Sequence, residues 1–186
     1  MAEYYFLMSQ LPSLDGISEN MILPITEERF LELCHRFLSK KAQSEINKLS
    51  LIPSRNHEKS YSGLIEAWNE GERNLRLALA KVRAEKMNKL FDIENKPLSV
   101  KLMQTAHTAV EMESPLEAEK FLNRYRLEFL ETLRPMDNFS EDAVFYYGLK
   151  LKLSLRIRQF DAGIGEAAYR NIYNSILNRD RLEAVQ

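Results

Sequence analysis

The sequence of 186 residues predicts an all-α fold, an irregular bundle of six to seven helices around one long central helix. Glycine and proline number only six each, which favours long helices over a turn-rich β fold. Several segments begin with a serine or threonine that can cap a helix. Within them, apolar residues recur every three or four positions, the spacing of one helix face. The length fits one domain, so residues 1–186 are expected to form a single helical domain with a polar tail over about 178–186.

The N-terminal quarter of the chain predicts two helices after an ambiguous start. Residues 3–8 are an aromatic, apolar run that is too short to distinguish a buried extended segment from a first helical turn. Residues 12–24 contain prolines and a glycine and are expected to form a loop. A helix is predicted over residues 26–38, because Thr26 is a suitable N-cap and acidic residues follow it. A second, weaker helix is predicted over residues 39–49.

The longest predicted helix follows a polar break at residues 53–60 and covers about 62–91. Gly71 interrupts it, at a cost of about 1 kcal/mol relative to alanine. Pro97 marks the next break. Spacings of three, four and seven join the apolar residues of this helix, which predicts a stripe of the bundle kind. They are Leu64, Trp68, Leu75, Leu79, Val82 and Leu90.

Two further helices are predicted over residues 99–111 and 114–133. The second has the clearest start in the chain. Ser114 is the expected N-cap, Pro115 lies at the first helical position and Glu117 completes a capping box.

The segment after Ser140 favours both kinds of secondary structure. Residues 149–158 alternate strictly between apolar and polar, which is typical of a strand. We favour a helix from Ser140 to 158, because Ser140 is a good cap and only Gly148 interrupts the segment. Its apolar residues then form two stripes, so that neighbours should cover it on two sides. A last helix is predicted over about residues 166–177.

Charge and cysteine content limit the kinds of partner and the cellular compartment that we expect. The 26 lysines and arginines nearly balance 27 aspartates and glutamates, which argues against nucleic acid as the main partner. One cysteine excludes an intrachain disulfide and fits a reducing compartment. No signal peptide or run of about 18 apolar residues is evident. We therefore expect a cytoplasmic protein that associates with a membrane only through other proteins.

The sequence contains no pattern typical of an active site, so we expect no enzymatic activity, cofactor, metal or small-molecule substrate. His35, His57 and His107 lie far apart, and none has a ligand at metal-binding spacing. Cys34 is expected to be a small buried apolar residue. The glycines at 163 and 165 lack the rest of a phosphate-binding loop.

Basic residues on the long helix, interleaved with glutamates such as Glu72, and two arginines beside Tyr125 are the best candidates for binding a partner. Intrahelical ion pairs and a solvated face explain most of the first pattern equally well. In the second, Tyr125 can be a core residue flanked by solvated arginines. The possible partner-binding residues are Arg73, Arg76, Arg83, Lys86, Arg124 and Arg126.

Several segments resemble a small bacterial family of uncharacterised proteins that are encoded among V-type ATPase genes. They cover most of the chain, and their motifs are patterns of helix packing and capping. They are Tyr4-Tyr5-Phe6-Leu7, Leu11-Pro12-Ser13-Leu14, Glu72-Arg73-Asn74-Leu75 with Ala80, Arg83 and Ala84, Ser114-Pro115-Leu116-Glu117-Ala118-Glu119-Lys120-Phe121-Leu122, Arg126-Leu127-Glu128-Phe129-Leu130-Glu131-Thr132-Leu133, Phe139, Tyr146-Tyr147-Gly148-Leu149-Lys150-Leu151 and Phe160-Asp161-Ala162-Gly163.

Such proteins are in turn similar to the adaptor protein of V/A-type ATPases that is known as C or d. The resemblance implies a non-catalytic adaptor between the central stalk and the membrane rotor, with other ATPase subunits as partners. This chain is shorter than that adaptor, which puts a complete coupling role in doubt. The alternative is a helical regulatory or nucleic-acid-binding module that uses the basic face of the long helix.

Overall fold

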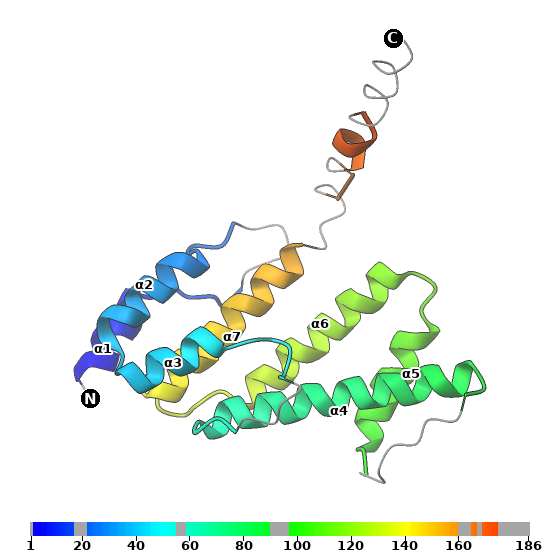
Figure 1. Ribbon diagram of the computed structural model, residues 1–186, viewed down its shortest axis with the longest axis horizontal. Coiled ribbons are helices and arrows are strands. Elements are labelled where there is room, and N and C mark those ends of the chain that lie inside the picture. Colours follow the sequence, from blue (N-terminus) through cyan, green and yellow to red (C-terminus); the bar gives the residue numbers. More distant parts are fainter. Residues whose placement is uncertain are drawn as a thin grey trace.

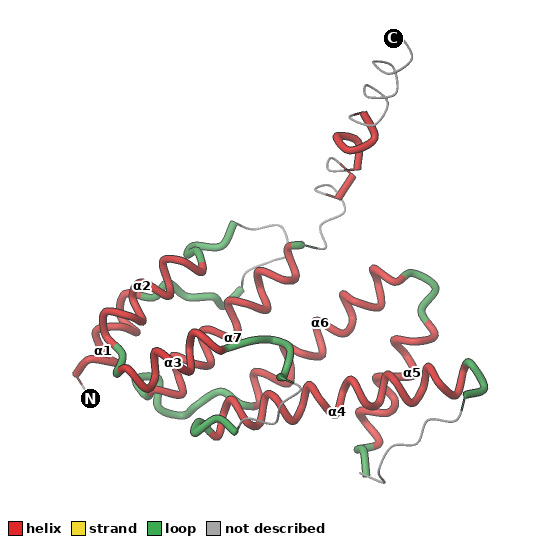
Figure 2. Tube along the Cα trace, in the orientation of Figure 1, coloured by secondary structure: helices red, strands yellow, loops and turns green. Residues whose placement is uncertain are grey.

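The computed structural model describes residues 2–16, 22–54, 59–89, 97–159, 165–166 and 169–174. Within these residues every regular element is a helix and no strand occurs, which confirms the all-α fold (Figure 1, Figure 2). None of the helices so described is long and apolar enough to cross a bilayer. They are α1 (Ala2–Gln10), α2 (Glu27–Phe37), α3 (Lys40–Lys48), α4 (Gly63–Lys86), α5 (Val100–Glu111), α6 (Pro115–Thr132) and α7 (Glu141–Arg158), and residues 165–166 and 169–174 are also helical.

Helices α2 to α7 each begin after a serine or threonine cap. In each case the side-chain oxygen accepts a hydrogen bond from the backbone N–H three residues later, a group that the helix itself leaves without a partner. The predicted starts of these helices are therefore confirmed, including the Ser114 cap with Pro115 behind it. The caps are Thr26, Ser39, Ser62, Ser99, Ser114 and Ser140.

The structure decides the segment that the sequence left open and confirms the helix that we favoured over residues 149–158. The aromatic run at residues 3–8 is part of α1, and the alternating run at 149–158 is part of α7. Helix α7 packs against α1, α2, α3, α4 and α6, and every residue from 143 to 151 is buried. The alternation arises because a helix enclosed on several sides needs apolar residues on more than one face.

Helix α4 ends at Lys86, earlier than the predicted end near residue 91. Asn88 adopts a positive φ of 52°, and the Lys89 N–H donates to the Ala84 carbonyl oxygen at 2.9 Å. This left-handed turn satisfies carbonyl groups at the helix end and stops its propagation. Residues 90–96, part of the predicted last helix over 166–177, and the polar tail over 178–186 lie outside the described residues.

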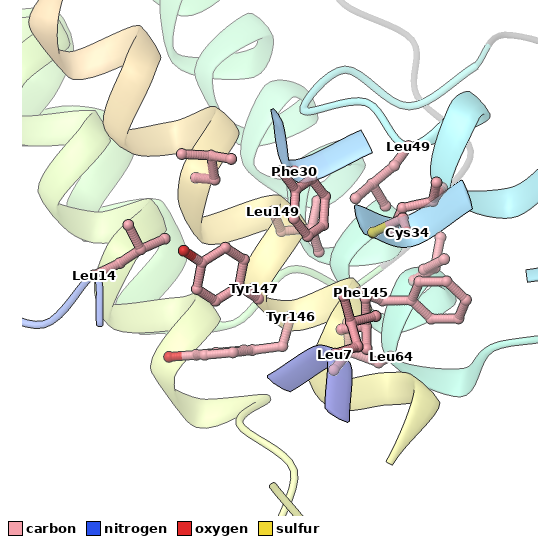
Figure 3. Close-up of a cluster of buried hydrophobic side chains, with 14 of the residues drawn as sticks. Leu7, Leu14, Phe30, Cys34, Leu49, Leu64, Phe145, Tyr146, Tyr147 and Leu149 are labelled. Carbon is pink, nitrogen blue, oxygen red and sulfur yellow. The ribbon is translucent and has the colours of Figure 1, made fainter. Parts of the chain in front are cut away.

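The buried apolar side chains form two cores. The first lies among α1, α2, α3, α7, the first half of α4 and the second half of α6, and Figure 3 shows Leu7 and Leu64 beside Phe145 within it. The second lies among α5, the second half of α4 and the first half of α6. Figure 1 shows α4 and α6 running through both regions, so these two helices connect the cores.

Gly148 allows the first core to close around α7. A Cβ atom at this position would lie 2.8 Å from Leu49 Cδ2 and 3.2 Å from the ring of Phe30. The absence of a side chain therefore lets α2 and α3 pack against the backbone of α7. The neighbouring Tyr147 ring lies tilted against Phe30 with ring centroids 5.4 Å apart (Figure 3).

Candidate functional site

A buried ion pair joins α4 to α6. Glu72 on α4 and Arg126 on α6 have exposed fractions of only 3% and 7%. Arg126 Nε donates to Glu72 Oε2 at 3.0 Å, and Arg126 Nη2 donates to Glu72 Oε1 at 3.1 Å. Two parallel hydrogen bonds between a guanidinium and a carboxylate fix orientation as well as distance.

Further polar side chains extend this pair into a network over three helices. Arg76, one turn after Glu72, donates to Glu72 Oε1 at 3.0 Å. The Nη1 atom of Arg126 donates to Asn123 Oδ1 at 3.1 Å and to Glu119 Oε1 at 3.3 Å. Arg156 on α7 donates to the same Glu119 oxygen at 2.5 Å. We call Arg76, Glu72, Arg126, Asn123, Glu119 and Arg156 the ion network.

The close approach of α4 and α6 explains why this network is buried. A Cβ atom at Gly71 would lie 2.2 Å from Phe129 Cε1, so the backbone of α4 touches the Phe129 ring directly. That ring stacks on Trp68 with centroids 6.1 Å apart. Little room for solvent remains beside Glu72, and a carboxylate buried in this way needs ionic partners.

The ion network lies between the two hydrophobic cores. On α4, Glu72 falls between Trp68 of the first core and Leu75 of the second. On α6, Arg126 falls between Leu130 of the first core and Leu122 of the second. A polar layer therefore separates the cores while tying together the helices that connect them.

A second charged cluster surrounds Lys150 on α7. Its ammonium group donates to Asp15 Oδ1 at 2.5 Å and to Glu131 Oε1 at 2.7 Å. Burial alone would lower the pKa of Lys150, but these two hydrogen bonds outweigh burial and raise the pKa above its ordinary value. The hydrogen bond from Lys150 and its charge lower the pKa of the Asp15 carboxyl. Nearby, the Tyr147 hydroxyl donates to the Pro12 carbonyl oxygen at 2.9 Å.

A cavity of about 140 Å³ opens beside this cluster, between α1 and the connection from α6 to α7. Tyr146, whose pKa burial raises to about 12, forms part of its wall. The other lining residues are Met8, Leu11, Pro12, Ser13, Leu14, Asp15, Arg134, Pro135, Asn138, Ala143, Tyr147 and Lys150.

The structure brings together two of the six residues predicted to bind a partner. Arg76 and Arg126 converge on Glu72, which is nearly inaccessible although the sequence placed it on a solvated face. Arg126 is itself buried, so its guanidinium is not part of the exposed surface. Arg83, Lys86 and Arg124 are exposed, Arg73 is half-buried, and Lys86 also donates to the Val110 carbonyl oxygen at 3.1 Å. The partner-binding role of the exposed residues stays a prediction.

Sequence reasoning missed the acidic half of the ion network, although a signal was present. Glu72 follows Trp68 by four positions and precedes Leu75 by three, so it occupies a core position of the apolar stripe. Arg126 occupies the corresponding position between Leu122 and Leu130. A charged residue at a core position of each of two helices points to a buried pair.

His35, His107 and Cys34 lie on helices α2 and α5, apart from both charged clusters. His35 is exposed and its Nε2 lies 3.1 Å from Asn47 Oδ1, and His107 is also exposed. His57 lies outside the described residues. Within the described part of the chain, no group of three or more histidine, cysteine, aspartate or glutamate side chains is arranged to hold a metal ion. Cys34 is buried, as predicted, and burial raises the pKa of its thiol to about 12.

Comparison of the chain with models of protein families, with curated proteins and with solved structures finds no match.

Proposed function

We propose that this chain is a non-catalytic structural or assembly protein of a V-type ATPase, an adaptor of the C or d kind between the central stalk and the membrane rotor. The observation that carries the proposal is the location of the segments that resemble the ATPase-associated family. These segments contact one another in space and fasten the helices together.

The long-helix segment and an α6 segment meet at the ion network. Glu72 opens Glu72-Arg73-Asn74-Leu75, and Arg126 opens the segment that continues to Leu133. Their side chains form the two hydrogen bonds between α4 and α6. The resemblance therefore includes both members of the joint between these helices.

The opening segment and the α7 segment meet at a second joint. Pro12 lies in Leu11-Pro12-Ser13-Leu14 and accepts a hydrogen bond from Tyr147 of the α7 segment. Lys150, from the same α7 segment, binds Asp15 directly after the opening segment. In both joints charged or polar groups hold a helix against its neighbour, either another helix or the segment that follows α1, which is a structural role.

An adaptor that transmits movement between two larger assemblies must keep its helices in fixed relative positions. Bidentate ion pairs hold helices in fixed relative positions, because their geometry tolerates little rotation of one helix against its neighbour. The proposed partners are other V-type ATPase subunits of the stalk and the membrane ring. The proposed location is the cytoplasm, at the membrane only through those partners.

Affinity purification of the tagged chain from mildly cross-linked source cells tests the proposal. Stalk and ring proteins of the V-type ATPase should co-purify in amounts comparable with the bait. A Gly148→Trp variant, which cannot close the first core around α7, is the matched control for capture by an unfolded chain. Absence of the ATPase proteins, or their equal capture by the control, would reject the proposal.

A further inference from the structure

Three aromatic side chains gather on the surface formed by α1 and the connection between α6 and α7. Tyr5, Phe6 and Phe139 are 53%, 55% and 45% exposed, and Met136 is fully exposed. The Tyr5 ring lies 4.9 Å from the Phe139 ring and 6.0 Å from the Phe6 ring, between centroids. We call Tyr5, Phe6 and Phe139 the aromatic patch, and Met136 is a further exposed apolar side chain three residues before Phe139. A contiguous group of exposed aromatic side chains is typical of a protein–protein contact.

The aromatic patch adjoins the cavity of about 140 Å³ described above. Met8, which lines the cavity, lies one turn after Tyr5 on α1, and Asn138, which also lines it, precedes Phe139. Apolar cavities of about 150 Å³ hold a benzene ring. This cavity therefore has room for one bulky apolar side chain from a partner that covers the patch.

Charges around the patch and the cavity are mainly negative. The carboxylates are Asp15, Glu131, Asp137 and Glu141, and the cations are Arg134 and Lys150. Asp137 accepts a hydrogen bond from the Phe139 N–H, and Glu141 accepts one from the Tyr4 hydroxyl, so both border the aromatic side chains. Lys150 neutralises part of the charge of Asp15 and Glu131, and Arg134 lies 4.0 Å from Glu131, so the surplus of two negative charges falls mainly on Asp137 and Glu141.

We propose that the aromatic patch and its cavity bind a basic amphipathic helix of a partner protein. One bulky apolar side chain of that helix enters the cavity, its neighbours one turn away cover Tyr5 and Phe139, and its lysines or arginines face the acidic rim. Helices that dock in this way place apolar residues at three- and four-residue spacing along one face. The proposal rests on the proposed function only in taking the partner to be an ATPase protein.

A second copy of this chain fits the surface less well. Its exposed apolar helix carries Tyr169, Ile172 and Tyr173, but the adjacent Arg170 already pairs with Glu166 at 2.5 Å. Over its described residues, that helix therefore offers an acidic rim no net positive charge. We therefore take the source of the positive charge to be a different protein.

Two synthetic peptides of about five helical turns test the proposal by fluorescence anisotropy. They share one leucine and phenylalanine face, and their polar faces are all lysine in one and all glutamate in the other. The lysine peptide should bind the full chain at least about tenfold more tightly, with an affinity that falls as salt screens the charges. Equal affinities would overturn the proposal, as would a concentration-dependent dimer that excludes the peptide.

Variants at exposed positions locate the site. Tyr5→Ser with Phe139→Ser should weaken binding of the lysine peptide by about tenfold or more, as expected for aromatic hot spots. Val100→Ser on α5, 74% exposed and distant in the fold, should leave binding unchanged. Met136→Glu should tighten binding and Met136→Lys should weaken it, each by about two- to fivefold. Unchanged binding by the double variant, with circular dichroism like that of the parent chain, would overturn the proposal.

The same double variant separates this proposal from the proposed function. If ATPase proteins co-purify with the parent chain but not with the double variant, both proposals are supported. If they co-purify equally with both, the docking surface is rejected and the ATPase role stands. If they co-purify with neither while the peptide still binds as expected, the ATPase role fails and the surface stands.

Discussion

Arg126 on α6 donates two hydrogen bonds to Glu72 on α4 at the level where the two hydrophobic cores meet. Each residue replaces an apolar side chain in the stripe of its helix. A shift of either helix along its axis would leave a buried charge without a partner, so the pair selects one alignment of α4 and α6. Apolar side chains at the same two positions would tolerate several alignments.

Breaking this pair from one side should destabilise the fold strongly. Arg126→Met leaves Glu72 buried with only Arg76 as a cation, and we expect a loss of about 3–5 kcal/mol in the free energy of unfolding. The double variant Glu72→Met with Arg126→Met should lose much less, because both charges are gone. Urea denaturation followed by circular dichroism measures these differences. A single variant that loses less than about 1 kcal/mol would contradict the buried pairing.

Replacing Gly71 by alanine should destabilise the protein, although alanine favours helices by about 1 kcal/mol. The new methyl group would meet the Phe129 ring at 2.2 Å, and overpacking of this kind costs about 1–3 kcal/mol. Gly63→Ala is the matched control, because nothing lies within 4 Å of its Cβ position. Thermal unfolding should show opposite shifts for the two variants, and adding Phe129→Leu should partly restore Gly71→Ala.

Stability should fall in acid in part through Asp15. Its hydrogen bond to Lys150 lowers its pKa below the ordinary value of 3.8, so the folded state holds this proton less tightly than the unfolded state does. The resulting stabilisation is present above pH 3.8 and is lost as the pH falls through the lower, folded-state pKa. Asp15→Asn should therefore flatten the acid side of a plot of urea midpoint against pH. An identical slope in both proteins would contradict the prediction.

The thiol of Cys34 should react only when the first core opens. Its pKa of about 12 leaves almost no thiolate near neutral pH, and its side chain is buried. A chromogenic disulfide reagent should therefore react slowly in buffer and rapidly in concentrated guanidinium chloride. Ser44→Cys provides an exposed thiol on α3 for comparison and should react rapidly in both conditions. Rapid reaction of Cys34 in buffer would contradict its burial.

The exposed basic residues on α4 test the nucleic-acid alternative. For an ATPase adaptor, we expect no salt-dependent binding of single- or double-stranded RNA by the parent chain. The charge reversal Arg83→Glu should likewise change neither the stability nor the anisotropy of a labelled RNA. Binding that weakens steeply with salt, and is lost in the variant, would favour the nucleic-acid-binding module instead.

Local chemistry explains which parts of the fold the sequence predicted. The start of each helix from α2 to α7 depends on a serine or threonine and the few residues after it, so caps such as Ser114 and Ser140 were recognisable. The end of α4 depends on the left-handed conformation of Asn88, which asparagine permits without requiring it. The helix over residues 149–158 follows from the Ser140 cap and the lack of turn residues, but the alternation within it reflects the helices packed around α7, which a single segment does not reveal.

The ion network shows why the candidate site was only partly predicted. Basic residues on α4 and α6 were recognised, but which of them lie inside depends on how the two helices rotate against each other. Arg124 is exposed while Arg126 is buried, although the two are separated only by Tyr125. The close approach that fixes this rotation comes from Gly71 and Phe129, which lie 58 positions apart in the chain.

Trp68, the single tryptophan of the chain, belongs to the first core and stacks on Phe129 beside the polar layer. Its emission therefore follows disruption of that core and is insensitive to loosening confined to α5 and its neighbours. Far-ultraviolet circular dichroism, by contrast, records the helices that surround both cores. Coincident unfolding transitions in the two signals would mean that the ion network links the two cores into one cooperative unit. Separated transitions would mean that the two cores unfold independently.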